Sequence, residues 1–392
     1  MFYYLFDWLE AEFNMPGAGL FQYISFRAAC SFICSMLIVI IFGKSFINAM
    51  RRRGIGEETR DDEKEKQGTP TMGGILIIIA IIIPTLLFAR PDNIYVLIML
   101  GTTLWLGLIG FIDDYIKVFK HDKKGLPGKF KVIGQVVLGL VDGLLLIYHP
   151  DLASTKTTIP FVKNFEFDYS WLVSWIGEGA EKYTVLVYVP ICIFIVTAIS
   201  NASNLTDGID GLATASGAIM GGTLAILAWL SSNVIMANYL NIVYLSNASE
   251  LTMFISSFVG ALLGFLWYNT HPATIFMGDT GSLTIGGIIA VFALLIRKEL
   301  LLPLLCGIYV AEDASVIIQR WSCKLYRFRH KLPKGVDVPV EKRAFWYTPL
   351  HHHYQPKHRK DGKGLNDEKI VQRFTIIGIL LAIATVVSFK LR

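Results

Sequence analysis

Three aspartates stand where apolar segments of this 392-residue chain end or begin, positions at which a partly desolvated carboxylate costs free energy. Asp113 and Asp114 are adjacent, so on a helix they point about 100° apart and are expected to serve different purposes. Asp279 lies among glycines just before an apolar segment, which lets its backbone and side chain approach a ligand closely. One carboxylate with phosphate oxygens and water is the usual environment of Mg²⁺. The alternatives are a solvated helix end for the pair and an N-cap for Asp279.

A second polar group consists of Asn204, Asp207 and Asp210, whose spacing of three residues brings neighbours onto one side of a helical turn. The stretch is not an EF-hand loop, because no glutamate occupies the twelfth position. A glycine-rich helix cap explains Gly208 and Gly211 but leaves three acidic or amide side chains unexplained. We therefore expect this loop to bind a ligand.

Two further segments are suited to phosphate. Residues 66–74 form a lysine- and threonine-bearing turn before an apolar run, although they lack the glycine and lysine spacing of a Walker A loop. His351, His352 and His353 are consecutive, whereas two histidines that share a metal ion on a helix are four residues apart. We expect donors or cations facing a phosphate, with a His-rich surface tract as the alternative. Carboxylates for Mg²⁺, cations for phosphates and a candidate base are what phosphoryl transfer requires.

The composition indicates that a membrane surrounds these groups. Hydrophobic residues make up 53% of the chain and charged residues 17%, against roughly 45–50% and 25% in ordinary soluble domains. The apolar residues form long continuous runs, which excludes a soluble enzyme, a disordered chain and a fibre, and argues against a β-barrel. A net charge of +5 does not make a nucleic-acid binder the default. We expect an all-α polytopic membrane protein with a lipid substrate and no nucleic-acid partner.

Ten apolar segments approach the length of about 20 residues that a membrane-spanning helix needs. They leave no separate soluble domain, so residues 1–392 are expected to form one integral-membrane domain. The first 20 residues contain acidic groups but no lysine or arginine, which argues against a signal peptide. Their aromatic residues suggest a short interfacial helix, with a frayed terminus as the alternative. The loop 150–183 is expected to hold an interfacial or hairpin element. The ten segments are 22–43, 73–90, 94–112, 132–149, 184–200, 212–231, 251–268, 282–296, 299–319 and 371–390.

Lysine and arginine orient the chain, because they concentrate in cytoplasmic loops. Of the 36 basic residues, 26 fall in the loops that follow the first, third and ninth segments. This bias predicts cytoplasmic odd-numbered loops and places both termini on the periplasmic side. Two of these loops, 201–211 and 269–281, hold no basic residue and carry the asparagines and aspartates. The candidate site is therefore expected to face the cytoplasm.

The motifs together resemble the phospho-N-acetylmuramoyl-pentapeptide-transferase family, within the polyprenyl-phosphate N-acetylhexosamine-1-phosphate transferase superfamily. The resemblance runs in order from about residue 44 to the C-terminus. Its Asp-Asp and Asn-x-x-Asp motifs belong to the superfamily, while the Thr-Pro-Thr-Met-Gly-Gly turn and the unbroken His triplet narrow it to the muramoyl-pentapeptide branch. The matching stretches are 66–74, 113–115, 204–211, 276–282 and 349–354.

This resemblance implies a ten-helix enzyme of the bacterial inner membrane, usually a homodimer, whose active site faces the cytoplasm. Such an enzyme moves phospho-MurNAc-pentapeptide from UDP-MurNAc-pentapeptide to undecaprenyl phosphate, which yields lipid I and UMP for peptidoglycan synthesis. It requires Mg²⁺. The chain departs from the family pattern at Gln355, where glutamate is common, and in the expanded segments 150–183 and 320–342.

The resemblance also implies roles for single residues. Asp279 matches the Mg²⁺ ligand, Asp113 matches the residue that orients or deprotonates the lipid phosphate, and Asp114 lies beside it. We add His351 to these catalytic candidates. The nucleoside-side pocket is matched by Asn204, Asp207, Asp210, Asn269 and Phe276, the last of which would stack on uracil. Polar contacts around the phosphates and sugar are matched by Lys66, Thr71, Lys129, Gln319, His351, His352 and His353, with Lys131 close to Lys129.

The expected mechanism is a direct displacement in which an oxygen of the lipid phosphate attacks the β-phosphorus of the donor. A two-step route through a phosphorylated aspartate is the alternative mechanism. One alternative function is a sister transferase that uses UDP-GlcNAc. Another is a transporter that uses intramembrane acids such as Asp142, Glu312 and Asp313. Most acids cluster in the loops and no inverted repeat is visible, which argues against the transporter.

Overall fold

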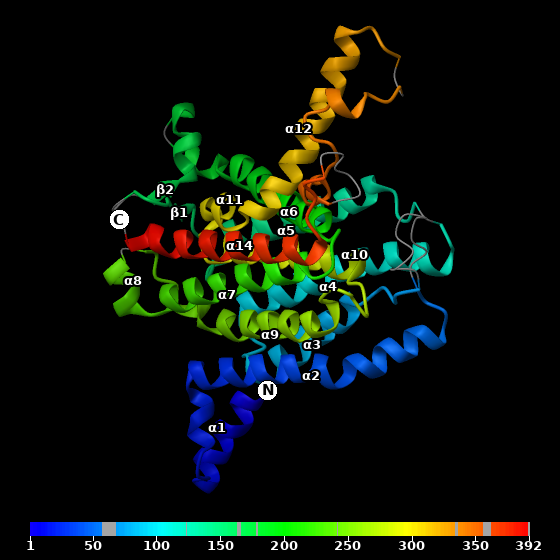
Figure 1. Cartoon of the computed structure of the whole chain (residues 1–392). Coiled ribbons are helices and arrows are strands. Elements are labelled where there is room, and N and C mark those ends of the chain that lie inside the picture. Colours follow the sequence, from blue (N-terminus) through cyan, green and yellow to red (C-terminus); the bar gives the residue numbers. More distant parts are fainter. Residues whose placement is uncertain are drawn as a thin grey trace.

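The computed structural model describes residues 1–56, 68–122, 124–162, 166–177, 179–240, 242–333, 336–355 and 362–390. Within these ranges the chain is a bundle of helices to which a single two-stranded hairpin is attached (Figure 1). The prediction of an all-α polytopic architecture is confirmed.

Eight helices in the described ranges are long and apolar enough to cross a membrane. They coincide with eight of the ten predicted segments, because a continuous apolar run satisfies its own backbone hydrogen bonds only as a helix in lipid. The eight are α2 (Ile24–Arg52), α4 (Ile94–Phe119), α5 (Gly128–Tyr148), α6 (Val185–Thr206), α7 (Leu212–Ser232), α9 (Leu251–Asn269), α10 (Gly278–Leu295) and α14 (Asp367–Lys390).

The predicted segment 73–90 forms a shorter helix than expected. This helix, α3 (Gly74–Phe88), has 15 residues. At a rise of 1.5 Å per residue it is about 22 Å long, less than the hydrocarbon core of about 30 Å. It is apolar and carries a proline, Pro84, inside it. The prediction of a full span is therefore not met by this helix alone.

The predicted segment 299–319 is broken rather than continuous. Its first part holds the short α11 (Leu302–Leu305), and its second part is α12 (Gly307–Arg329); the two directions differ by 76°. At the break, Gly307 lies so close to α14 that an added Cβ would be 2.8 Å from Leu381 Cδ1. In Figure 1, α12 accordingly leaves the direction shared by most helices of the bundle.

The direction of each helix brings the polar motifs to one end of the bundle. α4, α6 and α9 end at this end, while α10 and α14 begin there (Figure 1). The opposite end carries the start of α4 and the last described residues of α14. Motifs that are more than 150 residues apart in the chain therefore meet, as the alternation of spans predicts.

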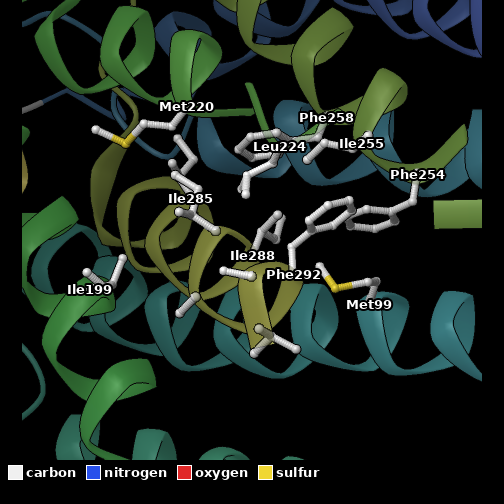
Figure 2. Close-up of a cluster of buried hydrophobic side chains, with 14 of the residues drawn as sticks. Met99, Ile199, Met220, Leu224, Phe254, Ile255, Phe258, Ile285, Ile288 and Phe292 are labelled. Carbon is white, nitrogen blue, oxygen red and sulfur yellow. The ribbon is translucent and has the colours of Figure 1, made fainter. Parts of the chain in front are cut away.

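Helix α10 lies at the centre, and all of its residues from Thr280 to Leu295 are buried. Figure 2 shows Ile285, Ile288 and Phe292 of this helix packed among side chains of the surrounding helices. Since lipid tails are as apolar as these residues, close packing rather than escape from water must hold such helices together. Glycine permits it: a Cβ on Gly286 would be 2.5 Å from the carbonyl oxygen of Ile199 in α6.

Shorter elements complete the chain. An N-terminal helix, α1 (Phe2–Phe13), confirms the predicted helix, and the predicted hairpin is formed by β1 (Lys156–Thr158) and β2 (Glu166–Asp168). The backbone N–H of Thr158 donates to the carbonyl of Arg297, which ties the hairpin to the end of α10. The remaining elements are α8 (Val234–Leu240), α13 (Leu350–Tyr354) and the short 3₁₀ helices η1 (Ala18–Gln22), η3 (Tyr169–Leu172), η4 (Ser174–Ile176), η5 (Ala180–Tyr183), η6 (Ser246–Glu250), η7 (Glu299–Leu301) and η8 (Val340–Lys342).

Candidate active site

Asp113, Asp114 and Asp279 meet between the end of α4 and the start of α10. One carboxylate oxygen from each lies within 4.8 Å of the other two. The first two aspartates are buried, and the side chain of Asp279 is 16% exposed. An all-oxygen donor set of this kind can hold a hard divalent cation, so the acidic cluster is a candidate metal site.

Asp114 holds the first turn of α10. Its Oδ1 accepts a hydrogen bond from the backbone N–H of Asp279 at 3.0 Å, and its Oδ2 accepts from the N–H of Thr280 at 2.9 Å and from the Thr280 hydroxyl at 2.5 Å. These N–H groups have no partner within their own helix, and a carboxylate at a helix N-terminus also interacts favourably with the helix dipole. Asp279 is thus inside the first turn, and the alternative that it caps the helix itself is not observed.

Two glycines allow this close approach. Gly278 has a positive φ of 73°, and a Cβ on it would be 2.5 Å from Asp114 Oδ2. A Cβ on Gly110 of α4 would be 2.3 Å from the backbone carbonyl oxygen of Asp279. Side chains at either position would push α4 and α10 apart, so the glycines set the spacing of the acidic cluster.

Two lysines neutralise most of the cluster's charge. Lys117 Nζ is 2.6 Å from Asp113 Oδ2 and 3.3 Å from Asp279 Oδ2. Lys131 Nζ is 2.9 Å from Asp113 Oδ1 and is also bonded to Asp279. Three carboxylates and two ammonium groups leave one formal negative charge, which favours a cation, while the ammonium groups can meet phosphate oxygens.

The sequence prediction did not include these two lysines among the site residues. Lys129, which it did include, is exposed, and its Nζ lies 5.2 Å from the ring centroid of Phe130. Lys131 approaches the acidic cluster in its place. The position of Lys117, one helical turn after Asp113, was a usable signal, because residues four apart lie on one face of a helix.

The loops after α6 and α9 are bonded to each other. Asp210 Oδ2 faces His271 Nδ1 at 3.1 Å and accepts the backbone N–H of Ala273 at 3.1 Å. Asn204 Nδ2 donates to Ser282 Oγ at 2.9 Å. Asn204 at the end of α6 and Asp210 in the loop after it, two of the five residues predicted for the nucleoside-side pocket, thus bond to the start of α10 and to the segment before it.

Asn269 and Phe276, also predicted for the nucleoside-side pocket, shape the segment before α10. Asn269 is buried: its Oδ1 accepts from the Thr214 hydroxyl at 2.8 Å, and its Nδ2 donates to the carbonyl of Ile275 at 3.0 Å. Phe276 is half-buried, and its carbonyl accepts the N–H of Gly73 at 2.9 Å. The amide side chain of Asn269 therefore holds the loop, while the Phe276 ring retains the partial exposure that stacking needs.

The three histidines have three different partners. His351 faces Glu312, His352 Nδ1 lies 2.7 Å from Gln355 Oε1, and the backbone N–H of Trp346 donates to His353 Nδ1 at 3.2 Å. The three rings therefore point to three different groups rather than to one common point. This agrees with their consecutive positions, which do not have the spacing of histidines that share a metal ion.

Four other predicted residues complete the comparison. Gln319 of α12 exchanges two hydrogen bonds of 2.9 Å with the backbone of Phe345 and so fixes the loop before α13. Thr71 is buried just before α3, and Asp207 is half-buried at the end of α6. Lys66 lies outside the described residues.

Two models of known protein families match the sequence of this chain. The model described as glycosyl transferase family 4 matches residues 96–297, and phospho-N-acetylmuramoyl-pentapeptide-transferase signature 1 matches residues 66–78. Proteins named phospho-N-acetylmuramoyl-pentapeptide-transferase from Flavobacterium johnsoniae, Flavobacterium psychrophilum and Parabacteroides distasonis are 50%, 49% and 47% identical to the chain, with complete coverage of both sequences.

The chain belongs to the phospho-N-acetylmuramoyl-pentapeptide-transferase family. The family predicted from the motifs is thereby confirmed, and the transporter alternative is wrong. As a member of this transferase family, the chain is a multi-pass membrane enzyme whose acidic cluster can hold a metal ion.

Proposed function

We propose that this transferase moves phospho-MurNAc-pentapeptide from UDP-MurNAc-pentapeptide to undecaprenyl phosphate, with lipid I and UMP as products. The names of the relatives supply the transferred group, and the chain's membrane-spanning helices suit a polyprenyl acceptor. The observation that carries the proposal is the acidic cluster with its two lysines at one end of the bundle. It joins a candidate cation site to two ammonium groups, the combination that phosphoryl transfer needs.

The residues fit Mg²⁺. Asp279 and Asp113 offer carboxylate oxygens, and among the described residues the donor set consists of carboxylates, without thiolate or imidazole. The oxygens of Asp114 are taken by the N–H groups of α10, which are fixed in the helix, whereas those of Asp279 and Asp113 contact the two lysine side chains. Asp279 and Asp113 would therefore hold the ion once the lysines contact phosphate oxygens. When bound, Mg²⁺ neutralises the charge that develops on the UMP leaving group.

The chain's own residues orient the reactants. Lys117 and Lys131 can shift from carboxylate to phosphate oxygens without leaving the site, since both already contact two carboxylates each. Asp113 orients the attacking lipid phosphate or takes its proton. Much of that phosphate is already dianionic at neutral pH, because its second pKa is about 6. Orientation and charge therefore contribute more than base catalysis.

The transfer is a direct displacement. An oxygen of undecaprenyl phosphate bonds to the β-phosphorus of the donor while the bond from this phosphorus to the bridging oxygen breaks, and UMP carries that oxygen away. A phosphorylated aspartate is the competing intermediate. Incubation with the donor in the absence of lipid should leave the protein unlabelled by the sugar phosphate; a trapped adduct would establish the two-step route.

The location and assembly are part of the same proposal. The basic loops favour a cytoplasmic active site in the bacterial inner membrane and periplasmic termini. We further propose one integral-membrane domain per chain and a homodimer. The mass of the purified protein in detergent tests the dimer, and cysteine labelling from each side of the membrane tests the orientation.

Release of UMP by the purified chain tests the proposed activity. With undecaprenyl phosphate and Mg²⁺, UMP should form from UDP-MurNAc-pentapeptide and not from UDP-GlcNAc. Turnover of UDP-GlcNAc alone would make the chain the sister transferase instead.

A further inference from the structure

A buried glutamate of α12 holds the first histidine of the triplet. The carboxylate of Glu312 accepts the backbone N–H of His351 at 3.2 and 3.3 Å, and its Oε2 lies 3.2 Å from the ring atom Nδ1. At most 1% of either side chain is exposed. A buried carboxylate is costly unless it is compensated, and within the described residues the side chain of Glu312 bonds only to His351.

The other ring nitrogen of His351 faces the loop that carries the Asn204, Asp207 and Asp210 motif. A Cβ built on Gly208 would lie 2.3 Å from Nε2 and 2.7 Å from Cε1. The ring therefore lies directly against the backbone of this loop, and only a glycine leaves it room. This contact gives Gly208 a packing role in addition to the helix cap that the sequence suggests.

Nε2 is buried and has no hydrogen-bond partner in the described part of the chain. Native proteins rarely keep a buried polar atom unpaired, since it loses its hydrogen bonds to water and gains none in return. Such an atom beside a motif loop indicates a group whose partner arrives with the substrate. Asp207 and Asp210, which lie on either side of Gly208 in the loop, belong to the predicted nucleoside-side pocket.

We propose that Glu312 is a positioning residue for the transfer reaction. It keeps the proton of His351 on Nδ1 and directs Nε2 toward the loop 204–211, where Nε2 meets a polar group of the donor. An imidazole with Nδ1–H bonded to a carboxylate presents Nε2 as an acceptor when neutral and as a second donor when protonated. The role of Glu312 depends on the proposed function, whereas the tautomer of His351 can be measured without it.

The isosteric change Glu312→Gln tests this role, with Asp313→Asn as the matched control. Asp313 is the next carboxylate on the same helix and is only half-buried. A glutamine amide can donate to Nδ1, which favours the opposite tautomer. We expect E312Q to lower kcat about tenfold or more, as loss of a carboxylate that orients a histidine does, with a smaller change in the KM for the donor. D313N should stay within about twofold of the parent, as surface changes usually do.

The tautomer supplies a readout that a purely structural role would not move. Nitrogen NMR of isotope-labelled histidine, with the His351 signals assigned by their loss in His351→Asn, should show the proton on Nδ1 in the parent and on Nε2 in E312Q. Parent-like kcat or an unchanged tautomer in E312Q would overturn the proposal. If the parent itself releases no UMP, the proposed function fails, and the tautomer still decides the role of Glu312.

A second variant changes the loop residue that contacts the Nε2 side of the His351 ring. Gly208→Ala places a methyl group 2.3 Å from Nε2, too close for the ring to stay in place, but leaves Glu312 intact. We expect a fall in kcat similar to that of E312Q while the protein remains folded, because the ring is displaced from the loop. Parent-like activity of G208A would contradict the contact between His351 and the loop.

Discussion

The carboxylate of Asp114 on α4 accepts the backbone N–H of Asp279 on α10 at 3.0 Å. The two residues are adjacent in the acidic cluster but have separate tasks: one holds the helix that carries the other. Asp279 retains its own carboxylate for a cation and for the two lysines. The acidic cluster is thus a candidate metal site built where α4 meets the start of α10.

Asp279→Asn should remove activity without unfolding the protein. The amide keeps the shape of the side chain but loses the charge that binds a cation and the lysines. We expect kcat to fall about 100- to 1,000-fold, the usual effect of removing one electrostatic contact to a transition state. UMP release measures the rate, and thermal melting in detergent measures folding. Activity near that of the parent would exclude Asp279 as the metal ligand.

Asp114→Asn should mainly lower stability. An asparagine is neutral and accepts through one oxygen only, so both N–H groups of α10 lose a charged partner and at least one of them loses its acceptor. Each hydrogen bond to a charged group contributes about 1.5–3 kcal/mol, and the melting temperature of D114N should fall below that of D279N. A variant that melts like the parent but is inactive would instead give Asp114 a direct catalytic role.

Lys131 and Lys129 form a matched pair, because they are two residues apart and only the first reaches the acidic cluster. Lys131→Met should lower kcat at least about tenfold, since a charge-assisted bond contributes about 1.5–3 kcal/mol. Lys129→Met should remain within about twofold. Equal losses, or a larger loss for K129M, would show that the loop rearranges to bring Lys129 into the site.

Gly278→Ala should separate α10 from α4. The added Cβ would lie 2.5 Å from Asp114 Oδ2, and φ of 73° is unfavourable for alanine by about 1–2 kcal/mol. Both melting temperature and activity should fall. Gly101→Ala is the control, since nothing lies within 4 Å of its Cβ and a helical glycine gains about 0.5–1 kcal/mol as alanine. A stable, active G278A would contradict the close contact between Gly278 of α10 and Asp114 of α4.

The membrane helices could be predicted because each is a continuous apolar run whose length is visible locally. The break at Gly307 and the shortness of α3 could not, since an apolar run reads the same whether or not it bends. Contacts between glycines and distant residues, such as Gly110 with Asp279, determine where helices approach. The contact between Gly110 and Asp279 joins segments more than 150 residues apart, and no local sequence pattern reveals it.

For the candidate site, the sequence identified most of the residues but not the role of each one. The motif residues were identified, but the roles of Asp113 and Asp114 could not be separated, because adjacency on a helix shows only that they point differently. The structure separates them by their partners. Glu312 was named only as an acid of the transporter alternative, because its contact with His351 spans 39 residues and depends on the fold.

The most direct test of the account is a Mg²⁺ titration of UMP and lipid I formation by the purified parent and D279N, after divalent cations are removed by chelation. The parent should be inactive without metal and regain full transfer from UDP-MurNAc-pentapeptide as Mg²⁺ is added, while D279N should stay inactive at every concentration. Transfer by the chelated parent, or full recovery of D279N, would contradict a metal-dependent site built on Asp279.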